Sequence, residues 1–374
     1  MKIHVPGSRK RSGLNGGWVE RAIGWTAVSY ETERVPRCMR HRHARHSCAR
    51  VCLGIAVTVI AVTASAATGS HPAEAAHAPP RITISSPKAA RHPSGTKLLI
   101  RFSCHSGAGI ASCRGTLVGP GTKSRKVASG SRISPAKTGS HTLRITARDR
   151  RGTSATTKLR FIVERTIRWS GHTWFVRHPG WGGPGPNRWS DSRANVRVSG
   201  GELILSIVPD KFGRWTSSEV DNQRHLGYGT YRWVVSSDLS RADPHQVLGM
   251  FVFGGTGPYA DEIDLEASRW GNPLAPSGSA AVWQNLRTQA KAFTSFAYSD
   301  RPPYVHEFRW SRDRVDFRVT DAAGAALLDW TVTVGVPKPS SEVPIVNYWR
   351  FHGVPPSSSS TVRLASFTWS PLGR

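Results

Sequence analysis

Three carboxylates that alternate along one short segment are the residues of this chain best suited to chemistry. The segment, residues 261–266, reads Asp-Glu-Ile-Asp-Leu-Glu. Successive side chains of a β-strand point to opposite faces, so Glu262, Asp264 and Glu266 would share one face of a strand. Like charges held so close together are unfavourable. Glycoside hydrolysis requires a carboxylate beside a carboxylic acid, and we interpret the cluster in that sense.

The acidic segment is also compatible with two simpler roles. A charged face on a solvated edge strand would show the same alternation, and three carboxylates could bind a divalent cation. The flanking sequence favours a buried position instead. Residues 247–253 form an apolar run typical of a strand buried on both faces, and a Gly/Pro turn at 254–258 leads from it into the acidic segment. The carboxylates would therefore lie beside a central strand.

Several segments, taken in order, resemble glycoside hydrolase family 16, the group that contains lichenases and laminarinases. The matching segments are residues 227–231, 262–266, 306–310, 315–317 and 344–349. The resemblance covers about residues 170–370. It implies an all-β fold, a concanavalin A-like jelly-roll β-sandwich, over a domain that we place at 166–374. The family works without a cofactor, and we predict no catalytic metal, while a structural calcium ion stays open.

The same resemblance assigns a role to each carboxylate. Glu262 would be the nucleophile and Glu266 the general acid/base of a retaining mechanism, and Asp264 would orient the nucleophile or modulate its charge. Residues four apart on a straight strand are separated by about 13 Å, whereas a retaining pair needs carboxyl groups about 5–5.5 Å apart. The strand must therefore belong to a concave sheet. Ala267 departs from the lichenase pattern, in which an aromatic residue usually follows the last Glu.

Tryptophan is concentrated in the same part of the chain, which holds 12 of the 14 Trp after residue 165. Indole rings offer large flat surfaces for the C–H faces of sugars, although most of these rings could simply fill a core. We expect Tyr228, Trp283 and Trp349 to bind substrate in the cleft. Asn347 shares a strand face with Trp349 and would hydrogen-bond a sugar hydroxyl, and Trp270 would lie on a rim loop.

The start of the chain resembles an export signal rather than a domain. We interpret residues 1–67 as a leader whose secretory signal begins at Met39. A basic stretch is followed by an apolar run at 53–62 and by the small residues Ala-Ser-Ala at 64–66. Residues 68–80, rich in Ala, Pro and His, would be a linker. We therefore expect a secreted protein, extracellular or associated with the cell wall, with no membrane contact after cleavage.

Residues 81–165 have the pattern of a second small β-sandwich. Alternating or β-branched runs at 81–85, 97–103, 141–147 and 158–163 are separated by Ser/Gly/Pro turns. The pattern resembles the immunoglobulin-like domains appended to secreted bacterial enzymes. Cys104 and Cys113 remain after removal of the leader, and in an oxidising compartment this pair predicts a disulfide.

Positive charge is concentrated in this small domain, where 18 Lys and Arg face two acidic residues. Such a surface favours polyanions through salt-sensitive electrostatics. The expected partners are anionic cell-wall polymers or acidic polysaccharide. We predict no nucleic-acid binding, because the chain carries an export signal and no aromatic residues are interleaved with the basic ones. Arg-rich codon bias and simple solubility would account for the same charge.

Taken together, the sequence predicts a secreted retaining endo-glycosidase that hydrolyses a β-glucan or a related polysaccharide. Two alternatives remain. A transglycosylase would use the same residues and differ only in the acceptor of the glycosyl group. A lectin-like protein would bind the polysaccharide without cleaving it.

Overall fold

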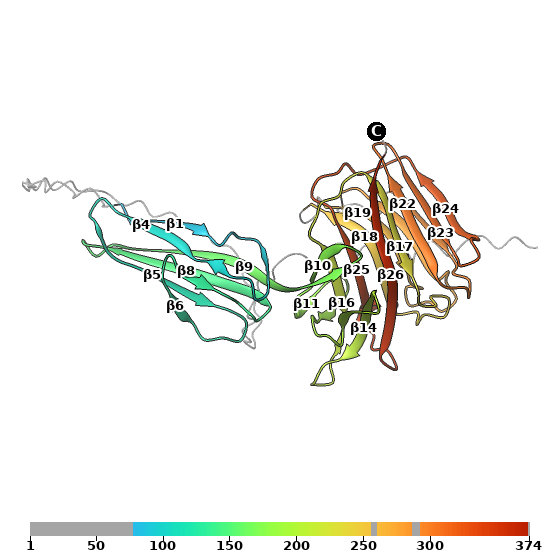
Figure 1. The fold of residues 1–374 in the computed structure, drawn as a ribbon, viewed down its shortest axis with the longest axis horizontal. Helices are drawn as coiled ribbons and strands as arrows, with labels where there is room; N and C mark the ends of the chain where they lie inside the picture. The colour runs from blue at the N-terminus through green and yellow to red at the C-terminus, as the bar shows by residue number, and fades with distance from the viewer. Residues whose placement is uncertain (1–77, 256–259, 286–291, 373–374) are drawn as a thin grey trace, which may run out of the picture.

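The computed structural model describes residues 78–255, 260–285 and 292–372 (Figure 1), and the regular secondary structure of these residues is almost entirely β-strand. The expected leader with its signal peptide lies outside the described residues, as does most of the linker. One 3-10 turn occurs at Phe351–Gly353. None of the described residues forms a helix long and apolar enough to cross a membrane. The all-β fold class expected from the sequence is confirmed.

The first unit is made of two layers. One layer contains four antiparallel strands and one short parallel strand: β5 (Ile110–Val118), β6 (Arg125–Val127), β8 (Gly139–Asp149), β9 (Ser154–Trp169) and, parallel to β9, β2 (Arg91–Pro93). The other contains two strand pairs: β1 (Arg81–Ser86) with β4 (Arg101–His105), and β3 (Leu98–Leu99) with β7 (Arg132–Ile133). The disulfide predicted from the sequence, Cys104–Cys113, is confirmed and joins β4 to β5.

The core of the first unit follows from the alternation of its strands. Buried and exposed residues alternate along the whole of β8, and Leu143 and Ile145 are fully buried. They pack with Phe102 from the other layer and with Phe161 and Val163 of β9. The outward side chains of the same strands are polar or charged. The relation of this unit to immunoglobulin-like domains stays a prediction.

The second unit is a sandwich of two antiparallel sheets. The inner sheet contains β10 (His172–Val176), β16 (Ser218–Asn222), β18 (Gln246–Gly254), β19 (Asp261–Ala267), β20 (Gly278–Trp283), β21 (Ala292–Phe296) and β25 (Val343–Arg350). The outer sheet contains β13 (Val196–Ser199), β14 (Glu202–Pro209), β15 (Trp215–Thr216), β17 (Gly229–Val235), β22 (Tyr304–Trp310), β23 (Val315–Thr320), β24 (Ala326–Val332) and β26 (Ser360–Pro371). A separate hairpin pairs β11 (Gly180–Gly182) with β12 (Asn187–Trp189).

One face of each sheet forms a shared hydrophobic core. Met250, Ile263 and Leu265 of the inner sheet pack with residues such as Trp233 and Phe308 of the outer sheet. Because the pleat alternates, the residues between them on β18 and β19 point to the opposite face of the inner sheet. That second face carries the acidic segment.

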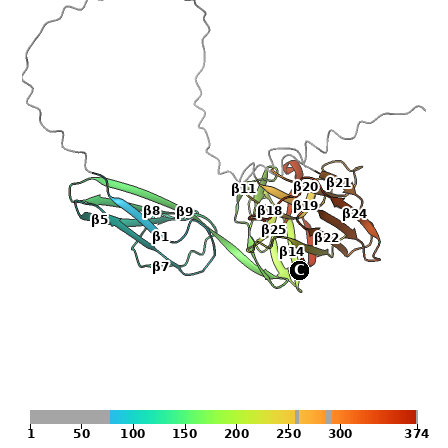
Figure 2. The same ribbon diagram turned by 90° about the horizontal axis from the view of Figure 1, so that it is seen from above.

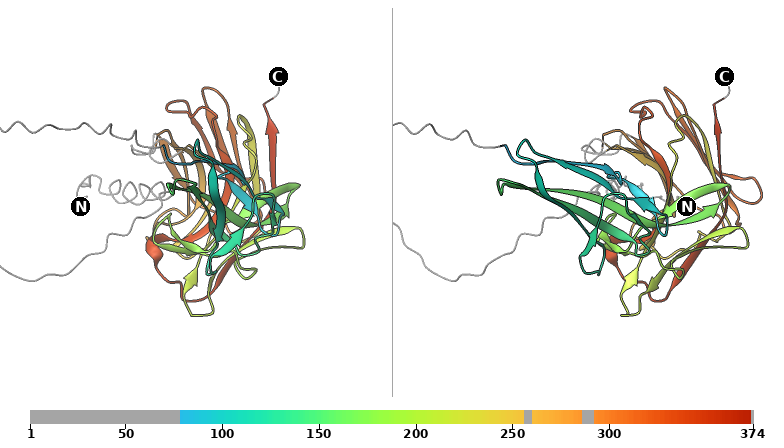
Figure 3. Two further views of the ribbon diagram at one scale, coloured as in Figure 1. Left: turned by 90° about the vertical axis from the view of Figure 1, so that its left-hand side faces the viewer. Right: turned by 60° about the vertical axis from the view of Figure 1, so that its left-hand side comes forward.

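The two units share one continuous sheet, because β9 belongs to both. The strand is 16 residues long; its residues 154–163 pair with β8 and its residues 165–169 pair with β10. The domain boundary expected at 165/166 therefore lies inside a strand. The order of the joined sheet is β21-β20-β19-β18-β25-β16-β10-β9-β8-β5-β6, with β2 beside β9. Figures 2 and 3 show β9 running from the first unit into the second.

Ion pairs reinforce the junction between the units. The guanidinium of Arg91 donates two hydrogen bonds to the carboxylate of Asp221, at 2.5 and 2.7 Å, and also bonds Glu164. His178 contacts the other oxygen of Glu164 through Nδ1 at 2.8 Å. Burial raises the pKa of Asp221 to about 6 in spite of the guanidinium beside it. The junction thus contains a cluster of ion pairs that joins Arg91 and Glu164 to Asp221 of the second unit.

Candidate active site

The structure brings the three carboxylates of the acidic segment to one face of the inner sheet. Strand β19 pairs without interruption with β18 on one side and with β20 on the other. Glu262 lies between Phe253 and Trp283, and Glu266 lies beside Gly249. All three carboxylates are less than a tenth exposed. The strand is central rather than at a sheet edge, as the sequence indicated.

The carboxyl groups interact with one another and with an indole. The carboxyl of Asp264 hydrogen-bonds that of Glu262, and Nε1–H of Trp283 donates to Asp264 Oδ2 at 2.9 Å. Glu262 therefore keeps one buried carboxylate oxygen, Oε2, without a hydrogen-bond partner among the described residues.

Burial dominates the electrostatics of this cluster. Desolvation raises the pKa of Glu266 well above its usual value, and the charge of Asp264 adds to that effect. Desolvation and the negative charge of Glu262 likewise raise the pKa of Asp264. Burial also raises the pKa of Glu262, but the hydrogen bond from Asp264 acts in the opposite direction and favours its ionised form. Glu262 is thus the carboxyl group whose ionised form a neighbour favours, although burial still raises its pKa to about 8.

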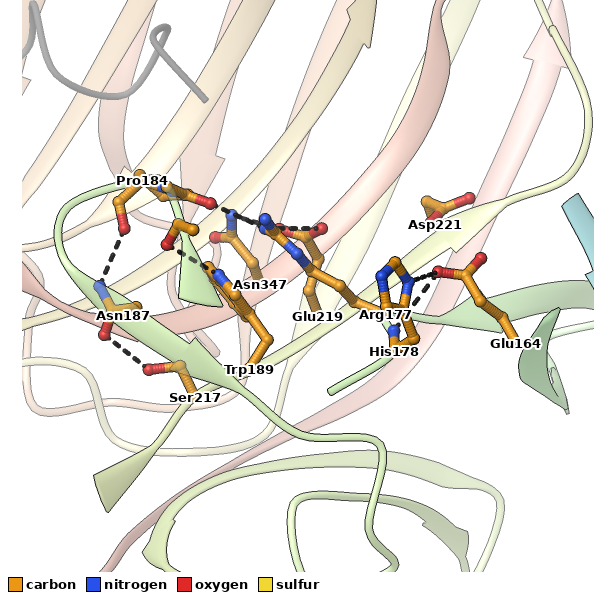
Figure 4. A network of polar contacts seen from close by, with 12 residues as sticks. Glu164, Arg177, His178, Pro184, Asn187, Trp189, Ser217, Glu219, Asp221 and Asn347 are labelled. Carbon is orange, nitrogen blue, oxygen red and sulfur yellow. Dashed lines mark hydrogen bonds and ion pairs between the residues drawn. The ribbon is translucent and has the colours of Figure 1, made fainter. Parts of the chain in front are cut away.

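Strands β25 and β16 add an amide and a fourth carboxylate to the same face. Asn347 Nδ2 donates to Glu219 Oε2 at 3.4 Å, while its Oδ1 has no partner within the described ranges. Arg177 Nη1 donates to both oxygens of Glu219, at 3.1 and 3.2 Å (Figure 4). A Cβ atom on Gly249 would lie 2.6 Å from Asn347 Oδ1, so only glycine at that position leaves room for the amide.

Aromatic rings gather at one end of this face. Trp349 is buried together with Trp189, Val247 and Phe351. Trp270, in the loop after β19, lies with its ring centroid 6.2 Å from that of Trp349. The indole N–H groups of Trp270 and Trp349 are buried without a hydrogen-bond partner among the described residues. These two predicted binding residues therefore lie together and offer unpartnered donors.

Tyr228 does not join this group. It precedes β17 in the outer sheet and packs edge-on against Trp310, with ring centroids 5.3 Å apart. It contributes to the sandwich core and not to the face that carries the carboxylates. The segment 227–231 matched a strand type without specifying the sheet in which the strand lies. Trp283 does reach the carboxylates, but its indole is almost fully buried and donates its N–H to Asp264.

A large cleft with a volume of about 1380 Å³ lies on the same side of the sheet, where it is lined by Glu219 and Trp349 but not by Glu262, Asp264 or Glu266. Its floor includes Phe253, Val343 and Ile345, and Phe253 is the register partner of Glu262. Trp181, on the β11–β12 hairpin, lines the cleft and is 59% exposed. The sequence did not single out Trp181 as a binding residue. Trp181 lies in a run of Gly and Pro residues, which provide few side chains to bury a ring, and this position was the available signal of an exposed ring.

Glu219 and Arg177 were also missed from the sequence. Glu219 alternates with Asp221 along β16, and this alternation was the available signal; only the pairing of β16 with β25 brings Glu219 beside Asn347. No group of three or more His, Cys, Asp or Glu residues among the described residues is placed to hold a metal ion. The arrangement offers paired acid and base groups, a hydroxyl acceptor at Asn347 and flat apolar surfaces beside a long cleft.

Comparison with known proteins finds similarity in solved structures alone, since no family model and no curated protein matches the chain. The chain is similar to the β-glucanase of Bacillus licheniformis, with 16% identity over 55% of this chain and 96% of that chain and a TM-score of 0.45. A lichenase from a mouse hindgut metagenome shares 18% identity over 55% of this chain and 96% of its own, with a TM-score of 0.44. A pseudo β-1,3-glucanase of Mycobacterium tuberculosis, also an immunostimulatory antigen, shares 20% identity over 52% of this chain and 88% of its own, with a TM-score of 0.40.

Proposed function

We propose that this protein is a retaining endo-glycosidase that hydrolyses a β-glucan or a related polysaccharide. The observation that carries the proposal is the set of three buried carboxyl groups on one face of β19, interacting with one another beside a large cleft. A merely structural cluster of this kind would be unfavourable, because each ionised carboxylate loses its hydration on burial. The resemblance of the acidic segment to family 16 supplies the polysaccharide class.

The proposed mechanism gives each carboxyl group one task. Glu262, ionised, attacks the anomeric carbon with its unpartnered oxygen while Glu266 donates its proton to the departing glycosidic oxygen. Glu266, now ionised, then removes a proton from water, and the resulting attack on the anomeric carbon releases Glu262. Asp264 donates a hydrogen bond to Glu262, which favours the ionised form of the nucleophile before its attack and after its release.

Substrate binding would use the neighbouring residues of the same face. The free Oδ1 of Asn347 accepts a hydrogen bond from a sugar hydroxyl, and the indole N–H groups of Trp349 and Trp270 donate to others. Trp181 provides the exposed ring at the edge of the cleft on which a sugar can stack.

Export belongs to the same proposal. The disulfide Cys104–Cys113 is consistent with folding in an oxidising compartment, outside the cytoplasm. A polymeric substrate of the cell wall or its surroundings would be met there.

Reducing-sugar release by the full chain on lichenan, laminarin, xyloglucan, agarose and curdlan tests the proposal, with Glu262→Gln as the matched control. Release from one polymer that disappears in Glu262→Gln is the expected result. Oligosaccharides longer than the starting ones would instead identify a transglycosylase. Binding without any release, equal in the two proteins, would overturn catalysis in favour of a lectin-like role.

A further inference from the structure

The face of the sheet that carries the carboxylates continues onto the first unit. Asp221 of β16 is the register partner of Phe175 in β10, and Phe175 is the partner of Thr166 in β9. Along β9 every second residue stays on the same face, which leads from Thr166 to Arg160 and Lys158. The outward face of the first unit and the carboxylate face of the second are therefore the same side of one sheet.

This side of the first unit is strongly basic. We call it the basic face, and it is formed by six exposed cations on four neighbouring strands: Arg114, Lys126, Arg144, Arg148, Lys158 and Arg160. Ser and Thr residues lie between them, among them Thr146 and Thr156, whose hydroxyls are 3.2 Å apart. None of the six forms an ion pair with another described residue. The two acids of the first unit do not compensate them, since Glu164 is paired with Arg91 and Asp149 is buried.

The cleft joins the basic face to the candidate active site. Its walls include Ser140, Arg160 and Ile162 of the first unit and Phe253 and Trp349 of the second. At the junction Arg91 forms ion pairs with both Asp221 and Glu164, which reduces the negative charge there. Five inter-strand steps separate β19 from β9, which corresponds to about 24 Å across the sheet. Only an extended polymer can contact both.

We propose that the substrate is an acidic polysaccharide that lies across the sheet, with its backbone at β19 and its carboxylate, sulfate or phosphate groups on the basic face. The inference rests on the proposed function, because it names the substrate class of that site. Exposed ion pairs are individually weak, so the preference for a charged chain arises from several contacts together. It weakens as salt shortens the range of the electrostatic attraction.

Binding of two polymers with the same backbone tests the inference. Lichenan and sulfated lichenan are titrated into the full chain carrying Glu262→Gln, which prevents turnover. The titrations are made at about 0.01 M and about 1 M salt, where the Debye length is about 30 Å and about 3 Å. At low salt sulfated lichenan is expected to bind about tenfold more tightly than lichenan, and this preference should vanish at high salt.

A charge-matched pair of triple variants locates the binding surface. The test variant removes Arg144, Arg148 and Lys158 from the basic face, and the control removes Arg81, Arg101 and Arg132, which are exposed on the other layer of the same unit. The test variant should lose the preference for sulfated lichenan, and the control should keep it. Equal losses in both variants, or a preference that salt does not affect, would overturn the inference.

Two further readouts separate this inference from the proposed function. In the catalytically intact chain, the test triple should lower kcat/KM about tenfold on sulfated lichenan and leave release from lichenan unchanged. If neither polymer is cleaved but the charge preference persists, the proposed function fails and the basic face is a binding surface only. If a short lichenan oligosaccharide and sulfated lichenan bind without competition, the anionic ligand is a separate partner, and the substrate assignment is overturned.

Discussion

Replacing Glu266 by Gln should stabilise the second unit above pH 5, by an amount that grows with pH. Burial, followed by the charge of Asp264, raises the pKa of Glu266 above its usual value. As the pH rises, the unfolded chain therefore loses this proton before the folded protein does. The contribution of Glu266 to stability is complete below the unfolded pKa and is lost as pH rises through the raised folded pKa. Gln resembles the protonated acid at every pH and avoids this loss.

The size of the effect follows from the titration alone. Each pH unit above the unfolded pKa of about 4.3 favours unfolding by about 1.4 kcal/mol until the folded pKa is reached. Between pH 5 and pH 7 the difference in unfolding free energy between the variant and the wild type should change by up to about 2.7 kcal/mol. Asp264 and Glu262 are raised in the same direction, so the wild type itself should lose stability over this range.

Urea unfolding followed by Trp fluorescence measures this difference. The region 81–165 contains no Trp, and 12 of the 14 Trp follow residue 165, so the signal reports the second unit. Glu307→Gln, on β22 of the outer sheet, controls for the loss of one negative charge from the whole protein. If Glu266→Gln and the wild type differ by the same free energy at pH 5 and pH 7, the Glu266 carboxyl group is not held protonated by burial beside Asp264.

Two further variants probe the packing of the site and its edge. Gly249→Ala should lower the unfolding free energy by about 1–3 kcal/mol, because its Cβ would lie 2.6 Å from Asn347 Oδ1. The double variant with Asn347→Ala should recover most of this loss in the same urea experiment. If the two substitutions instead change the unfolding free energy additively, this contact is not the cause. Trp181→Ala should weaken polysaccharide binding about twofold to tenfold in calorimetric titrations without changing stability, since its ring is exposed at the cleft. Phe212→Ala, exposed but outside the cleft lining, is its control, and equal losses in both would refute a specific stacking role.

The parts of the site that the sequence predicted are those set by local alternation. Glu262, Asp264 and Glu266 share a face because a strand has a period of two, and the apolar run before them identified β18 as buried on both faces. The same rule placed Asn347 and Trp349 together on β25. These predictions needed no knowledge of which strands become neighbours.

The parts that the sequence did not predict depend on pairing between distant segments. Tyr228 directly precedes a strand of the expected kind, β17, but the sheet of that strand is fixed by pairing with β22 and β26 on the far side of the sandwich. Glu219 meets Asn347 only because β16 pairs with β25, which lies more than a hundred residues further along the chain. The alternation of Glu219 and Asp221 shows that the two share a face of β16, but it carries no local signal of this contact.

Strand β9 crosses the boundary between the two units that composition indicated. A change in charge and Trp content after residue 165 indicated this boundary. Strand β9 continues through this point and only changes its pairing partner, from β8 to β10. The strand's period of two then links the two units: a shift of one residue within β9 would turn Arg160 and Lys158 towards the first core and Phe161 outwards. The basic face and the carboxylates thus lie on one side of the sheet because the pleat is unbroken between them, and a substrate contacting both would depend on that register.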